Sequence, residues 1–96
     1  MTAQAKKQLQ KKRNKIDSLD KKLLQVLAQR FSVVSEISRI KKKMNWPIIQ
    51  AGRKRQINIT RLKQARLLKL QPQLVKALFE LIHQESIRIQ KKERKS

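Results

Sequence analysis

Residues 27–41 read LAQRFSVVSEISRIK, and this stretch decides how the rest of the chain is interpreted. On a helix, Leu27 and Val34 share one apolar side, because residues seven positions apart lie on the same face. Arg30 and Lys41 fall on that side too. A helix that directs two cations toward its interior face needs either solvent or a counter-charge for them.

The stretch belongs to a much longer helical segment. Residues 6–43 contain neither glycine nor proline, and apolar residues recur at helical spacing throughout. The segment predicts one helix of roughly 57 Å, at about 1.5 Å per residue. A compact domain of this size has a radius of gyration of only about 13 Å, so the remaining chain can cover only part of such a helix. We therefore expect an intertwined, all-α homodimer in which a second copy covers the rest.

Two shorter helices are predicted after the long one. Trp46-Pro47 ends the first helix, because proline disfavours helical geometry in the residue before it. A second helix is expected over about 50–68. Pro72 suits the first position of a third helix that ends near Lys92. Strand alternation is absent, so the fold class is all-α with one long and two shorter helices.

Length and composition limit the alternatives. The 96 residues suffice for one domain, 1–96, with basic tails at about 1–6 and 92–96. The chain has no cysteine, which excludes disulfides and thiolate metal sites. The first dozen residues lack an apolar signal region, and no run approaches the length of a membrane span. We expect a cytoplasmic protein without membrane partners.

The charge balance is extreme. Twenty-six Lys and Arg against six Asp and Glu give a formal net charge of +20, which indicates a polyanionic partner such as nucleic acid. The only aromatic residues are Phe31, Trp46 and Phe79, so no platform for stacking bases is present. A solvated basic face is the usual explanation of such charge, and a non-catalytic helical dimer that binds nucleic acid stays as an alternative.

The apolar stripe of the long helix carries more cations than its own acids can balance. Alternating steps of four and three along it give Leu9, Arg13, Ile16, Asp20, Leu23, Leu27, Arg30, Val34, Ile37 and Lys41. We call these ten positions the seam. Its cations could reach water along their long side chains, or pair with Asp20. Alternatively, the missing counter-charge is a bound anion with at least two negative groups.

The spacing along the helix bears on such a ligand. Arg30 and Lys41 are roughly 16 Å apart along the axis, so their side chains could converge on the two ends of one small molecule. Arg13 lies about 25 Å from Arg30 and could reach the same molecule only across the dimer.

The third helix adds a matching polar face, and other chemistries are poorly represented. Its apolar face contains Val75, Leu78, Phe79 and Ile82 and continues, at the same spacing, into Ser86 and Gln90. A hydroxyl and an amide there could hydrogen-bond a bound anion. His83 is the only histidine, and Asp17 and Asp20 are the only aspartates. We expect no metal, no cofactor and no catalytic triad, so any reaction would depend on positioning and electrostatics.

The sequence resembles the all-helical (class II) chorismate mutases over about residues 9–91. The matching motifs, in order, are RxxIxxLD at 13–20, LLQVLAQR at 23–30, IK at 40–41, PI at 47–48, Arg53, LFELIHQES at 78–86, and Gln90. The resemblance implies a dimer of three-helix protomers with two active sites, each an isomerase site that converts chorismate to prephenate without a cofactor. Such an enzyme belongs to aromatic amino acid biosynthesis by the shikimate pathway.

The resemblance also implies roles for individual residues. Arg30 and Arg53, with Arg13 of the partner subunit, would grip the two carboxylates of the substrate. Lys41 and Gln90 would donate to the ether oxygen whose bond breaks, and Ser86 would lie in the pocket. On this interpretation, the cations face inward because a dianion completes the core.

Two positions depart from the family pattern. The family usually has acidic residues near the ring hydroxyl of the substrate where this chain has Gln50 and Lys54. Lys54 is expected to add a positive charge beside the substrate, and Lys54→Glu to restore the usual contact and raise kcat. The related isochorismate pyruvate-lyases also lack the second of these acids, so that activity is the alternative on the same fold.

Overall fold

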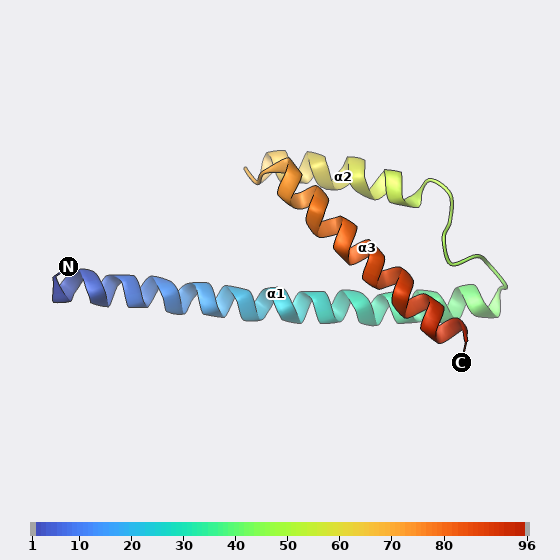
Figure 1. Cartoon of the computed structure of the whole chain (residues 1–96), viewed down its shortest axis with the longest axis horizontal. Coiled ribbons are helices and arrows are strands. Elements are labelled where there is room, and N and C mark those ends of the chain that lie inside the picture. Colours follow the sequence, from blue (N-terminus) through green and yellow to red (C-terminus); the bar gives the residue numbers. More distant parts are fainter. Residues whose placement is uncertain (1, 96) are drawn as a thin grey trace. The chain divides into compact units, whose positions relative to one another are not determined.

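A computed structural model describes residues 2–95, and this part of the chain contains three α-helices and no strand. They are α1 (Ala3–Lys43), α2 (Arg53–Leu67) and α3 (Pro72–Arg94) (Figure 1). The predicted all-α class with one long and two shorter helices is confirmed. Over the described residues, none of the three helices is both long and apolar enough to span a membrane.

The chain divides into two compact units, and the division falls within α1. The first unit, Met1–Ser32, contains the N-terminal part of α1 and has no buried residue among 2–32. Ile16 and Leu23 of the predicted seam are 55% and 52% exposed there. The second unit, Val33–Ser96, contains the end of α1 together with α2 and α3.

Both outer helices are longer than the sequence suggested. The predicted basic tails include residues 1 and 96, which lie outside the described residues, but 3–6 and 92–94 are helical. At the start of α1, the Thr2 hydroxyl accepts a hydrogen bond of 3.1 Å from the Ala5 backbone N–H. This bond satisfies one of the free N–H groups of the first turn and allows the helix to begin at residue 3.

The end of α1 follows the predicted break at Trp46-Pro47. Asn45 has a φ of 56°, and the Trp46 N–H donates to the Lys41 carbonyl at 2.7 Å. The Asn45 N–H donates to the Lys42 carbonyl at 3.2 Å. This pair of bonds is a Schellman motif, in which asparagine tolerates the left-handed position better than most residues. The motif directs the chain away from the helix just before Pro47.

The second helix starts later than predicted. It begins at Arg53 rather than near residue 50, and Gly52 precedes it with a φ of 82°. An L-residue rarely adopts this conformation, so a glycine at 52 allows the loop to turn into α2. Gln50, which we expected at the start of the helix, therefore lies in the loop, where its carbonyl accepts the Arg53 N–H at 3.3 Å.

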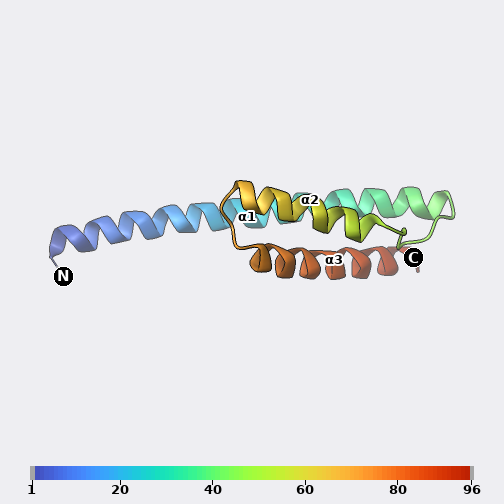
Figure 2. The same cartoon turned by 90° about the horizontal axis from the view of Figure 1, so that it is seen from above.

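Helices α2 and α3 form an antiparallel hairpin (Figure 2). The turn between them is a second Schellman motif, with Lys69 at a φ of 58° and the Leu70 N–H donating to the Ala65 carbonyl at 2.8 Å. Pro72 opens α3 as predicted. Ala65 of α2 and Val75 of α3 are buried, so the hairpin supplies much of the small apolar core of the second unit.

Candidate active site

Lys41 lies near the C-terminal end of α1 and hydrogen-bonds to neutral oxygens. Its Nζ donates to the Ile48 carbonyl at 2.6 Å and to Gln90 Oε1 at 2.9 Å, and the side chain is partly buried. The Schellman motif at the end of α1 turns the chain so that the loop carbonyl of Ile48 faces the ammonium. No ion pair joins Lys41 to a carboxylate within residues 2–95. The positive charge is therefore held in place without a counter-charge.

The surroundings of Lys41 disfavour its protonated form. Burial lowers the pKa of Lys41, and the positive charges of Arg94 and Arg53 lower it further. A partly desolvated ammonium beside two guanidinium groups is a site of positive potential. An anion bound there would relieve the repulsion and raise the pKa of Lys41 again. The electrostatics thus favour a negatively charged ligand.

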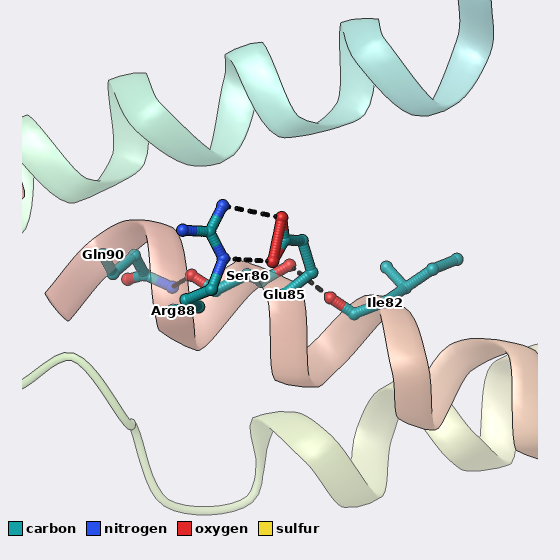
Figure 3. A network of polar contacts seen from close by, with 5 residues as sticks. All are labelled: Ile82, Glu85, Ser86, Arg88 and Gln90. Carbon is teal, nitrogen blue, oxygen red and sulfur yellow. Dashed lines mark hydrogen bonds and ion pairs between the residues drawn. The ribbon is translucent and has the colours of Figure 1, made fainter. Parts of the chain in front are cut away.

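Ser86 and Gln90 lie on the buried face of α3. They are 8% and 7% exposed, and they follow the buried Val75 and Ile82 at helical spacing, which confirms the predicted inward face. Gln90 Nε2 donates to the Ser86 carbonyl at 3.2 Å, and the Ser86 hydroxyl donates to the Ile82 carbonyl at 2.8 Å (Figure 3). These bonds along the helix hold the Gln90 amide so that its oxygen faces Lys41.

The arrangement leaves hydrogen-bond donors for a ligand. An ammonium has three N–H groups and Lys41 uses two of them, while a primary amide has two and Gln90 uses one. The two remaining N–H groups belong to side chains that are hydrogen-bonded to each other. The two N–H groups therefore lie on neighbouring side chains of one site.

Two further side chains, Arg94 and Ser38, were not singled out by the sequence. The Arg94 guanidinium donates to the Trp46 carbonyl at 2.8 Å and so ties the end of α3 to the loop beside Lys41. Ser38 is 2% exposed, and its buried hydroxyl has no hydrogen-bond partner in the described part of the chain. Ser38 lies four residues after Val34 and three before Lys41, so the helical period of the seam could have indicated it.

The predicted residues around the start of α2 are exposed. Arg53 donates to Gln56 Oε1 at 3.0 Å, and Gln50 lies in the loop. Lys54 Nζ lies 3.0 Å from Glu80 Oε2 on α3. The sequence predicted that Lys54 would add a positive charge beside the substrate, and in the structure this charge has a carboxylate partner. Its place beside a substrate stays a prediction. Glu80 was missed because the pattern along each helix does not reveal which exposed charges meet across a hairpin.

Arg13 and Arg30 belong to the first unit. Arg13 is exposed and Arg30 is partly covered, and both lie on the seam of α1. Their predicted contacts with a ligand stay predictions. Among the described residues, no three His, Asp or Glu side chains gather closely enough to hold a metal ion.

Comparison with known proteins places the chain in a family. The family model of chorismate mutase type II matches residues 12–91, so the chain belongs to this family. A curated relative is the T-protein of Enterobacter agglomerans, which is 34% identical over 74 residues. The match covers 77% of this chain but only 20% of the T-protein, so the chain spans about a fifth of the length of that relative. No solved structure matches the chain.

Proposed function

We propose that the protein is a chorismate mutase that converts chorismate to prephenate in one domain without a cofactor. The observation that carries the proposal is the hydrogen bond of 2.9 Å between Lys41 and Gln90, which are 49 residues apart. These are the two side chains that the family pattern assigns to the reacting ether oxygen. Membership in the family over residues 12–91 supports the same activity.

The reaction requires only what this site offers. In the Claisen rearrangement, the ether C–O bond breaks while a C–C bond forms within the same molecule, and negative charge builds on the ether oxygen. No proton, nucleophile or redox partner takes part. The free N–H groups of Lys41 and Gln90 would donate to that oxygen. Donors that are already oriented stabilise the developing charge more than the ground state, which is the condition for catalysis.

The carboxylates of the substrate need further cations. We assign them to Arg30, Arg53 and Arg13 of the partner subunit, with Ser86, Gln50 and Lys54 nearby. The positive charge of Arg53 already acts on Lys41, which supports its place beside the ammonium. Holding both carboxylates in the reactive conformation would supply the positioning part of the rate acceleration.

The proposed enzyme is an intertwined homodimer. Large apolar side chains of α1 are exposed in the single chain, including Ile16 at 55%, Leu23 at 52% and Ile40 at 55%. A helix of 41 residues with an apolar seam is poorly stable in water without a partner surface. A second copy would cover the seam and bring its Arg13 to the site. The lack of cysteine is compatible with the cytoplasm as its location.

The purified protein should be given chorismate and isochorismate in separate assays. Formation of prephenate from chorismate is the expected result. Pyruvate and salicylate from isochorismate, without prephenate from chorismate, would instead assign the lyase activity. Turnover of neither substrate by the folded, helical protein would overturn the proposal.

A further inference from the structure

Four lysines form a line along the first part of α1 (blue in Figure 1). Lys7, Lys11 and Lys15 follow one another at intervals of four residues, and Lys22 lies seven residues further on. At 3.6 residues per turn, all four lie within an arc of about 80°. They extend over about 22 Å of the helix, and the first three are spaced about 6 Å apart along the axis. We call these four residues the lysine stripe.

The lysine stripe is exposed and unbalanced. All four side chains are exposed, and no ion pair joins any of them to a carboxylate within residues 2–95. The acids of the first unit, Asp17 and Asp20, both fall outside the arc at the helical period. Like charges at intervals of four residues disfavour a helix slightly, so the stripe is not explained by helix stability.

The lysine stripe faces away from the seam. The seam residues of the first unit lie on the other side of α1, centred roughly 145° from the stripe. A partner that covers the seam therefore leaves the stripe in water. Within the first unit, the other positions in the arc are Gln4, Ser18, Gln25 and Gln29, so this part of the helix offers no apolar side chain in the arc to insert into a lipid layer.

We propose that the lysine stripe binds the phosphate backbone of double-stranded nucleic acid, independently of base sequence. A regular line of positive charges matches a regular line of phosphates, and lysine acts as a point charge without the planar geometry that reads base edges. The first unit has one aromatic residue, Phe31, so it offers no stacking platform for single strands. This binding is additional to the proposed catalysis and uses none of its residues.

The test is the salt dependence of duplex binding, measured by fluorescence anisotropy with short labelled DNA and RNA duplexes of random sequence. Each neutralised phosphate contributes about 0.9 to the slope of log Kobs against log salt. A variant with Lys7→Gln, Lys11→Gln and Lys15→Gln should lower that slope by about 2.7 and weaken binding at low salt. Lysine and glutamine have similar helix propensities, so the variant should keep its helix content by circular dichroism.

The matched control removes three cations of the same helix that lie outside the arc, through Lys6→Gln, Lys12→Gln and Lys21→Gln. It has the same net charge as the stripe variant but should keep its slope within about one unit of the wild type. An equal decrease of the salt slope in both variants would show that binding depends only on net charge, and it would overturn the proposal. So would failure of the wild type to bind duplexes, or binding to phosphatidylserine vesicles alone. Chorismate turnover, which the stripe variant should retain, reports separately on the proposed function.

Discussion

Replacing Lys41 by alanine tests the centre of the proposed site. The change removes the ammonium that donates to Ile48 and Gln90, together with the one N–H left for a ligand. Loss of one donor to a developing oxyanion typically costs 10²–10³ in rate, or about 2.7–4 kcal/mol of transition-state stabilisation. We expect kcat/KM for chorismate to fall by at least about 10²-fold, with most of the loss in kcat.

The fold should tolerate this change. The buried oxygen of Gln90 loses its partner, which costs about 1–3 kcal/mol, but a partly desolvated positive charge is removed as well. Lys43→Ala is the matched control, because Lys43 is an exposed lysine in the last turn of the same helix. It should keep the wild-type rate. If folded Lys41→Ala protein turns chorismate over within about tenfold of wild type, the assignment of Lys41 to the ether oxygen is wrong.

Three further changes follow from contacts in the second unit. Lys41 must be protonated to donate, so activity should fall as pH rises through its lowered pKa. Arg94→Gln removes a nearby positive charge and raises the pKa of Lys41, so it should move the alkaline limb of the kcat/KM profile to higher pH. An unmoved limb would contradict this. Lys54→Glu should lower Tm slightly, because it sets two carboxylates against each other. The double variant with Lys54→Glu and Glu80→Lys should recover the Tm, and failure to recover it would exclude this pairing. Lys69→Gly should raise Tm in thermal denaturation by a few degrees, because glycine relieves about 1 kcal/mol of left-handed strain, and a lower Tm would count against that conformation.

The sequence predicted the fold well where a local rule decides the structure. The run without glycine or proline predicted α1, and the two prolines predicted both breaks, because each rule concerns the backbone of neighbouring residues. The start of α2 was placed about three residues too early. Gly52 was visible in the sequence, but a single glycine does not reveal whether its φ is positive, and this conformation ends the loop.

The site was predictable only in part. Helical spacing identified Lys41, Ser86 and Gln90 as inward-facing, since it depends only on the period of one helix. The hydrogen bond between Lys41 and Gln90 depends on how two helices cross, which no spacing specifies. The same is true of the ion pair between Lys54 and Glu80, which joins two exposed positions 26 residues apart.

The most direct measurement of the central proposal mixes two inactive variants. Arg13→Ala and Lys41→Ala dimers should each be nearly inactive on chorismate. After subunit exchange about half of the dimers are mixed. In each mixed dimer one site has Lys41 from one chain and Arg13 from the other, while the second site lacks both. About one quarter of the wild-type activity should therefore return. If Arg13 acted within its own chain, every site in a mixed dimer would lack one of the two residues. Subunit exchange must first be verified. If activity then fails to recover, a site shared between two copies is contradicted.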